Sequence, residues 1–427
     1  MPGRRKFVST ISRGIASALL LPVIDFTPAL AVPKRTISQH TDEEAYWKEI
    51  RSLFPLSDEL VFLNCATMGP SPQAVIDAEA AVNLELNTRA QYRNNKDEVL
   101  ADIARLVKAD KQNIALTHNV TEGINIGAWS IDLQKGDEVI ISTHEHVGNA
   151  VPWLNRAHLE EIVITPIALL PTAEQMFGLV KASISTKTKV IALPHIPCTN
   201  GQVLPISEIC TYARQHGILT IVDGAHGPGL LELDLPAMGC DMYVSCCHKW
   251  MLGPKGTGFI YVRSESIEKL IPKFLGAHAD AGWDVLSSPP VLNGYVPTAH
   301  RFFYGTQSPA HYAGISAAIR FIEEIGMEKI ALRTRYLAAY LQERLLEIGS
   351  DKIEMLSPTE ASSRGASIAF NVRKMAYTEV QKTCNKQKII IRGVPENSIN
   401  CLRVSTHIYN SKEEIDRFVE VIRSCAW

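Results

Sequence analysis

The chain has 427 residues, of which 46% are hydrophobic and 21% charged, and this length and composition suit a globular enzyme of two lobes. The formal net charge is only −2, so no nucleic-acid partner is expected. The nine cysteines are scattered, odd in number and without a CxxC pair, so they predict neither a disulfide framework nor a metal site.

The first 31 residues differ in character from the rest. Arg4 and Arg5 precede Phe7, the apolar stretch GIASALLLPVI follows, and 29–31 (ALA) offers small residues for cleavage. This layout is typical of a bacterial twin-arginine signal peptide, and the apolar stretch is too short for a stable membrane span. We therefore expect 1–31 to be a signal peptide and the protein to be periplasmic or exported. A disordered basic tail or an uncleaved anchor is the alternative, and the protein would be cytoplasmic if the signal is not used.

Residues 41–55 read as a polar helix, and short apolar runs then alternate with helical segments. Residues 120–131 and 205–217 read as helices, and the following runs are typical of buried strands: 60–63, 113–119, 137–143, 161–167, 189–196, 219–226, 241–246 and 258–262. Nearly continuous apolar strands that alternate with helices predict an α/β fold with a mostly parallel sheet.

Beyond about residue 290 the pattern changes. Residues 315–349 predict two helices, and three apolar runs at 366–373, 388–394 and 400–410 precede a last helix at 411–424. We expect a large α/β domain over 32–295 and a smaller α+β domain over 296–427. Ligands of open α/β sheets bind at the carboxyl ends of the strands, so the candidate residues were sought there.

Two polar groups follow predicted strands in the first half of the chain. Thr121 lies at a helix start, where backbone N–H groups and a hydroxyl suit a phosphate, although an ordinary N-cap explains it equally well. His144, Glu145 and His146 follow the next strand, and an imidazole there either stacks on an aromatic cofactor or belongs to a solvated loop.

Asp223 and Lys249 complete the pattern. Asp223 ends a very apolar strand, and a buried carboxylate needs a charged partner, which could be a protonated pyridine nitrogen or an arginine. Lys249 lies in SCCHKWMLGPKG at the mouth of another strand, where an apolar surrounding favours the neutral amine that forms imines. A helix start, an imidazole, an aspartate and a lysine in this order describe a pyridoxal phosphate site.

These residues resemble those of the class V aminotransferase group of fold-type I pyridoxal phosphate enzymes. The group includes cysteine desulfurases, kynureninase-like enzymes and isopenicillin N epimerase-like proteins. The resemblance runs from about residue 63, in FLNCATMGP, to RVSTHIYNSKEEID near the C-terminus. It implies the fold-type I architecture, with a large domain built on a mostly parallel sheet and a smaller α+β C-terminal domain.

The resemblance also implies cofactor-binding roles. Lys249 would hold pyridoxal 5'-phosphate as an aldimine, His146 would stack on its ring, and Asp223 would pair with the pyridine nitrogen. His248 and Thr121 would bind the phosphate.

Three cofactor positions depart from the family pattern. Cys246 stands where a phosphate-binding serine is usual, and His226 replaces a glutamine that contacts the ring hydroxyl. Cys198 stands where desulfurases commonly have an asparagine and epimerase-like members a serine.

Further positions concern the substrate and the partner subunit. Arg403 matches the arginine that clamps the substrate carboxylate, and Asn64 lies near the same pocket in relatives. Gly305 and Thr306, in RFFYGTQSP, resemble the pair that reaches the phosphate of the other subunit, so a homodimer is expected.

The sequence favours an isopenicillin N epimerase-like enzyme that acts at the Cα of an amino acid, a small-molecule substrate. CHKW is similar to that branch, and Lys249 is the expected proton carrier; the outcome is racemisation or epimerisation, β-elimination, or another aminotransferase-family activity. No second base is assured, and Tyr304, His278 and His300 qualify only by residue type.

Two alternatives stay open. One is a cysteine or cystine C–S lyase or a desulfurase, although 389–400 lacks the loop cysteine of desulfurases and Cys401 is expected to be structural. The other is a catalytically silent binding protein with the same fold, against which the intact Asp223, His248, Lys249 and Arg403 argue.

Overall fold

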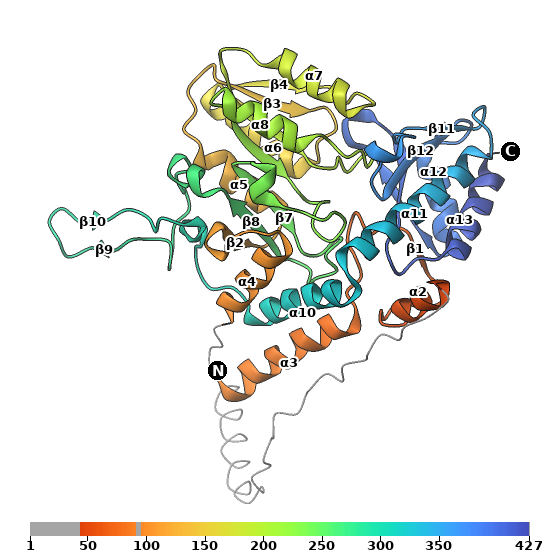
Figure 1. The fold of residues 1–427 in the computed structure, drawn as a ribbon, viewed down its shortest axis with the longest axis horizontal. Helices are drawn as coiled ribbons and strands as arrows, with labels where there is room; N and C mark the ends of the chain where they lie inside the picture. The colour runs from red at the N-terminus through yellow and green to blue at the C-terminus, as the bar shows by residue number, and fades with distance from the viewer. Residues whose placement is uncertain (1–42, 91–94, 427) are drawn as a thin grey trace, which may run out of the picture. The chain divides into compact units, whose positions relative to one another are not determined.

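A seven-stranded, mostly parallel sheet forms the centre of the large lobe. The computed structural model describes residues 43–90 and 95–426. The strand order is β2-β8-β7-β6-β5-β3-β4, and β8 alone runs antiparallel to its neighbours (Figure 1). The strands are β2 (Ile114–Thr117), β3 (Glu138–Ser142), β4 (Val163–Ile167), β5 (Thr188–Pro194), β6 (Leu219–Asp223), β7 (Met242–Cys246) and β8 (Gly258–Val262). The predicted α/β fold is confirmed.

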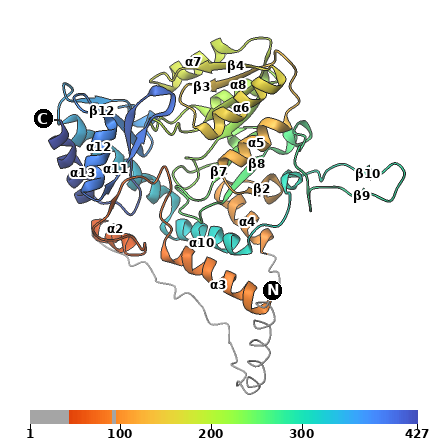
Figure 2. The ribbon, with the colours of Figure 1, turned by 180° about the vertical axis from the view of Figure 1, so that it is seen from behind.

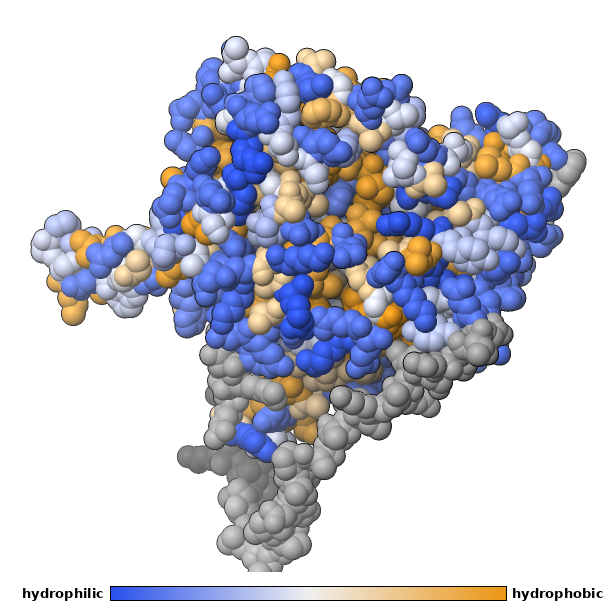
Figure 3. All heavy atoms as spheres, in the orientation of Figure 1, coloured by the Kyte–Doolittle hydropathy of each residue, from blue (hydrophilic) through white to orange (hydrophobic). Residues whose placement is uncertain are grey.

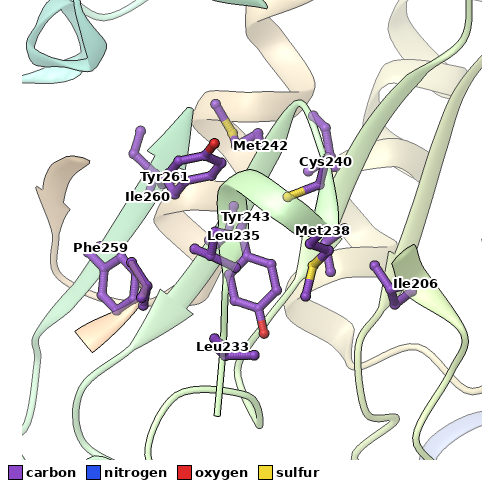
Figure 4. Close-up of a cluster of buried hydrophobic side chains, with 14 of the residues drawn as sticks. Ile206, Leu233, Leu235, Met238, Cys240, Met242, Tyr243, Phe259, Ile260 and Tyr261 are labelled. Atoms are coloured by element: carbon purple, nitrogen blue, oxygen red, sulfur yellow. The ribbon is translucent and has the colours of Figure 1, made fainter. Parts of the chain in front are cut away.

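Continuous apolar sequence makes these strands because both faces of the sheet are covered. Every residue of β7 and β8 is buried, so neither strand shows the alternation of a half-exposed sheet. In Figure 4, Met242 and Tyr243 of β7 lie among Phe259, Ile260 and Tyr261 of β8 and side chains of the short helix α9 (Leu235–Met238).

Helices cover the sheet and place their N-termini at the carboxyl ends of the strands. Helix α5 packs against β6, β7 and β8, whereas α8 packs against β6 and α7 against β4 (Figure 2). The helices of this lobe are α3 (Gln73–Arg89), α4 (Lys96–Leu106), α5 (Val120–Ser130), α6 (Val147–Glu160), α7 (Ala173–Ser183) and α8 (Ile206–Gln215). Because strand ends and helix starts meet along one edge, polar residues from both converge there.

The smaller lobe is built on a four-stranded antiparallel sheet of order β11-β12-β15-β14. Its strands are β11 (Ile353–Met355), β12 (Ser367–Val372), β14 (Arg392–Val394) and β15 (Cys401–Ser405), and its helices are α11 (Met327–Leu346), α12 (Tyr377–Lys386) and α13 (Lys412–Cys425). Near the start of the chain, α2 (Glu43–Arg51) precedes β1 (Val61–Phe62), which pairs in parallel with β13 (Ile389–Ile390). β1 therefore joins the smaller lobe, whereas the buried side chains of α2 belong to the core of the large sheet.

The two hydrophobic cores do not divide at residue 296. Helix α10 (Pro309–Ile325) packs against α3 and α4, and its Ile315 and Ile319 belong to the core of the large sheet. The second core takes up the chain at Leu337 in α11 and also includes Leu63. The predicted pair of helices is separated at Gly326, whose φ of 94° ends α10.

A β-hairpin projects from the large lobe with apolar side chains on its surface. Strand β9 (Trp283–Asp284) pairs with β10 (Val291–Leu292). Figure 3 shows orange, apolar atoms on this hairpin, and Leu286 near its tip is 92% exposed. We call the exposed side chains of Trp283, Val285, Leu286, Val291 and Leu292 the hairpin patch.

The predicted signal peptide at 1–31 lies outside the described residues. Among the helices of the described part of the chain, none has the length and apolar character needed to cross a bilayer.

Candidate active site

One cavity opens where β5, β6 and β7 end and where α5 and α6 begin. The sequence-predicted residues that line it are Thr121, His146, Cys198, Asp223, His226, Cys246, His248 and Lys249. They come from separate parts of the chain, and the parallel sheet brings them together because its carboxyl strand ends share one edge. Within 43–90 and 95–426, no group of three or more His, Cys, Asp or Glu side chains is arranged to hold a metal ion.

The start of α5 forms an anion-binding end of the cavity. Asn119 caps the helix by accepting a hydrogen bond from the Glu122 N–H at 2.9 Å, and Asn119, Val120 and Thr121 all line the cavity. The first N–H groups of an α-helix have no carbonyl partner within the helix, and they carry the positive end of its dipole. Backbone amides and the Thr121 hydroxyl can therefore receive a phosphate.

His248 faces the same cavity with one ring nitrogen already engaged. Its Nδ1 lies 3.3 Å from the carbonyl oxygen of Thr257, which only an Nδ1–H can satisfy, so Nε2 is left for a ligand. Burial, with a smaller contribution from Lys249, lowers the pKa of His248 to about 4. The ring is therefore neutral at pH 7 until an anion binds beside it.

Asp223 is the last residue of β6 and is only 5% exposed. One carboxyl oxygen accepts a hydrogen bond from the Ala225 N–H at 2.9 Å, and the side chain lines the cavity. Burial raises the pKa of this carboxyl, although Ala225 and Lys249 oppose the rise. A cationic N–H donor in the cavity would stabilise the carboxylate, as a protonated pyridine nitrogen does.

Lys249 follows β7, and its amine points at an imidazole. The Nζ atom lies 3.4 Å from Nε2 of His226, and the Nδ1 atom of His226 accepts a hydrogen bond from the Trp250 indole at 2.9 Å. Trp250 is buried and was missed in the sequence, because nothing in HKW shows that the tryptophan turns back to a residue 24 positions earlier.

His146 is the N-cap of α6. Its Nδ1 accepts a hydrogen bond from the Gly148 N–H at 3.0 Å, which fixes the ring at the cavity wall. Burial and then Lys249 lower the pKa of His146 to about 4, so the imidazole is neutral and presents a flat apolar face.

The two cavity cysteines are protonated thiols. Burial raises the pKa of Cys198, and it raises that of Cys246 to about 11. The Cys246 thiol lies 3.7 Å from the Ala225 carbonyl oxygen, so its proton is directed to the protein backbone.

Arg403 lies just behind the cavity wall and is fully buried. It donates to the Cys198 carbonyl at 2.8 Å, the Asn64 side chain at 3.1 Å and the Thr67 hydroxyl at 2.7 Å. Among the described residues its Nε has no hydrogen-bond partner. Cys198 and Thr67 line the cavity themselves, so their bonds to the guanidinium hold it against the cavity wall. The sequence placed Asn64 near this pocket, but it did not predict the contacts of Arg403 with Thr67 and with the Cys198 carbonyl.

Arg392 is a cavity residue that the sequence analysis missed. It lies opposite Arg403 in the β14–β15 pairing and is paired with the Glu396 carboxylate. The only sequence signal is a charge inside the apolar run KIIIRGV. The register of β14 on β15 places this charge beside the cavity, and the sequence does not reveal that register.

Gly305 and Thr306 do not line this cavity. They line a separate one together with His278, His300 and Lys96. Tyr304 is also away from the first cavity, because its hydroxyl donates to the Glu122 carboxylate. The three side chains considered as a second base therefore do not face Lys249 within one chain.

Comparison with known proteins gives the family. A family model described as aminotransferase class-V matches residues 61–418. A probable cysteine desulfurase of Xylella fastidiosa is 28% identical over 408 residues, covering 88% of this chain and 94% of that protein. Isopenicillin N epimerase of Streptomyces clavuligerus is 28% identical over 397 residues, covering 88% and 98%.

Solved structures share the fold. An apo cysteine desulfurase of Thermococcus onnurineus matches with a TM-score of 0.80 at 22% identity, over 91% of this chain and 99% of that one. A cystine C–S lyase in complex with cysteine persulfide matches with a TM-score of 0.78 at 23% identity, over 87% and 99%. The family match spans both lobes and the whole cavity, and the chain therefore belongs to the class V aminotransferase family of pyridoxal phosphate-dependent enzymes.

Proposed function

We propose that this enzyme removes the Cα proton of an α-amino acid with Lys249 and then expels a sulfur substituent from Cβ. The observation that carries the proposal is the placement of Lys249, Asp223 and the start of α5 in one cavity. A partly buried amine, a buried carboxylate and a helix N-terminus together meet the three needs of pyridoxal phosphate.

The residues present fit the cofactor. The uncapped N–H groups of α5 and the Thr121 hydroxyl would hold the phosphate, with His248 beside it. Asp223, whose pKa burial raises, gains a cationic partner if it meets the pyridine nitrogen. When bound, the cofactor withdraws electrons from the Cα of an attached amino acid.

Two arginines, Arg403 and Arg392, are placed to orient the substrate. Arg403 is held by three hydrogen bonds, so its guanidinium is pre-organised and loses little conformational freedom when it meets a carboxylate. Arg392 lines the cavity from the neighbouring strand and can exchange its Glu396 partner for a substrate anion. We assign the α-carboxylate to Arg403 with Thr67 and Asn64 as its supports.

The hydrogen bonds that the other cavity side chains already make favour elimination over epimerisation. His226 and His146 each already use Nδ1 as a hydrogen-bond acceptor, and Asp223 is reserved for the pyridine nitrogen. Lys249 is then the base that takes the Cα proton, and the Cβ–S bond breaks with its electron pair on sulfur. Hydrolysis of the released aminoacrylate gives pyruvate and ammonia.

The cysteines favour a lyase over a desulfurase. All nine are buried, including Cys401 on β15, so none is presented on an exposed loop as a sulfur acceptor. The sulfur would leave as a small thiol or persulfide.

Epimerisation is the second candidate, supported by the epimerase relative and by one residue. It needs a proton carrier besides Lys249, and the Cys198 thiol lines the cavity beside the Arg403 contact. Cys198→Ala should then abolish inversion while Cα exchange continues; under elimination this variant should retain pyruvate formation.

The experiment is a heavy-water assay with a panel of L- and D-amino acids that includes cysteine, cystine and their alkyl thioethers. Pyruvate and a sulfur product in equal amounts support elimination, and deuterium incorporation with inversion supports epimerisation. Retention of the Cα hydrogen in every amino acid that binds would contradict Cα deprotonation.

We also propose a homodimer with shared sites. Gly305 and Thr306 line a cavity of their own, which suits residues that serve the site of a second chain. The hairpin patch supports the same idea, because exposed apolar surface on a projecting arm is typical of protein interfaces.

Export remains a separate proposal, based on Arg4, Arg5 and the apolar stretch after them. A double Arg4→Lys, Arg5→Lys variant should stay in the cytoplasm of a bacterial host, while the unaltered chain reaches the periplasm. Equal distribution of the two would contradict the proposal.

A further inference from the structure

The hydrogen bond between Trp250 and His226 determines where the imidazole carries its proton. The indole Nε1–H can only donate, and it lies 2.9 Å from Nδ1 of His226 in a buried setting. Nδ1 must therefore present its lone pair. In a neutral imidazole the proton is then on Nε2.

Nε2 is the atom that faces the reactive amine. It lies 3.4 Å from Lys249 Nζ, and His226 lines the cavity while remaining 3% exposed. A protonated imidazole would direct an Nδ1–H at the indole N–H, which places two donors against each other. An acceptor oxygen brought into the cavity beside Nε2 would receive this N–H.

The groups around His226 reinforce its neutrality. Burial lowers the pKa of His226 well below its usual value, and the nearby charges of Lys249, Arg403 and Arg392 lower it further. Asp223 lies on the preceding strand end but is turned to the Ala225 N–H.

Trp250 is itself held by the smaller lobe. Its ring stacks on His407 at 5.6 Å between centroids, and His407 stacks on Tyr409 at 5.5 Å. His407 Nδ1 accepts from the Ile408 N–H at 2.7 Å, so the Nε2 atom, 3.1 Å from the Trp250 carbonyl, is the donor of that bond. The segment after β15 therefore fixes the indole in place.

We propose that Trp250 is a positioning residue that locks His226 as an Nε2–H donor directed into the cavity beside Lys249, where it would serve an acceptor oxygen of the cofactor. The use of this donor rests on the proposed cofactor site, whereas the lock itself is a property of the chain alone. A glutamine at this position would need no such lock, because an amide NH₂ donates in either setting.

The lock can be measured without cofactor, by NMR of the apoprotein with ¹⁵N-labelled histidine, in which His226→Gln identifies the His226 signal. We expect a neutral Nε2–H tautomer from pH 5 to 8. Trp250→Phe keeps a ring for His407 but removes the donor, so His226 should show mixed tautomers and titrate within this range. A His226 that is Nδ1–H or that titrates in the unaltered chain would overturn the inference.

Cofactor affinity provides a second test, which concerns the role of Trp250 in binding. Trp250→Phe should weaken pyridoxal phosphate binding roughly tenfold, the equivalent of one hydrogen bond. In the His226→Gln background the same change should have no effect, because glutamine donates by itself. Equal weakening in both backgrounds would mean that Trp250 acts through packing and would overturn the proposed role. A chain that does not bind the cofactor at all would refute the proposed function, while the NMR result on the lock would stand.

Discussion

Three imidazoles surround Lys249, and burial keeps each of them neutral. The pKa of His146 and of His248 is lowered to about 4, and that of His226 is lowered well below its usual value. Lys249 contributes to all three shifts through its charge. These three rings therefore add flat faces and hydrogen-bonding groups to the cavity without adding positive charge of their own.

Cofactor binding should therefore take up a proton at His248. A phosphate dianion beside this ring raises its pKa from about 4, so the bound state holds a proton that the free state lacks at pH 6. By linkage, affinity is strongest at low pH and weakens as pH rises through the pKa of the complex. Calorimetric titration with pyridoxamine phosphate, in buffers of different ionisation heat, measures the uptake. His248→Gln should reduce it, and equal uptake by both proteins would contradict the assignment.

Single residues at strand ends were predictable because each follows an unmistakable apolar run. Asp223 ends a run whose residues are nearly all buried, and Lys249 follows another. Arg392 and Trp250 were not predictable, because their roles depend on a strand register and on a bond to a distant ring. Long-range geometry of this kind leaves no local pattern in the sequence.

At the scale of elements, the predicted strands and helices of the large sheet form because their apolar runs are continuous and their turns are polar. The hairpin of β9 and β10 was not predicted, because its apolar residues are exposed and show no alternation that would indicate a strand. The packing of α10 against α3 joins this helix to the large lobe, although the predicted boundary at residue 296 placed it in the smaller domain, and no local pattern shows this packing.

Helix α5 links stability to cofactor binding through its cap. Asn119→Ala removes the hydrogen bond to the Glu122 N–H and should lower the free energy of unfolding by about 1 kcal/mol. It should also weaken cofactor affinity, because the frayed turn is the one that we propose receives the phosphate. Urea denaturation and absorbance titration measure the two effects.

Thr172→Ala is the matched control, since it removes the equivalent cap of α7, outside the cavity. It should cost similar stability and leave affinity unchanged. If both variants weaken binding equally, the start of α5 has no special role.

At the scale of the whole molecule, the proposed dimer predicts complementation between two impaired variants. Lys249→Ala lacks the amine, and Thr306→Ala lacks a charge-assisted hydrogen bond of about 1.5–3 kcal/mol, which should weaken cofactor binding by one to two decades. A hybrid dimer of the two carries one site with both residues intact. Mixing after mild dissociation should therefore restore activity at low cofactor concentration. No restoration, or a fully active monomer in sedimentation, would refute the shared site.

The most direct test of the account is borohydride reduction of the purified, cofactor-loaded protein, followed by peptide mapping. The protein should be yellow, lose its visible band on reduction, and carry the pyridoxyl group on Lys249. Lys255, which donates to the Ser71 hydroxyl at 2.9 Å, is the nearby lysine that should remain unlabelled. A label on Lys255, or a protein that stays colourless with added pyridoxal phosphate, would contradict the central claim that Lys249 holds the cofactor.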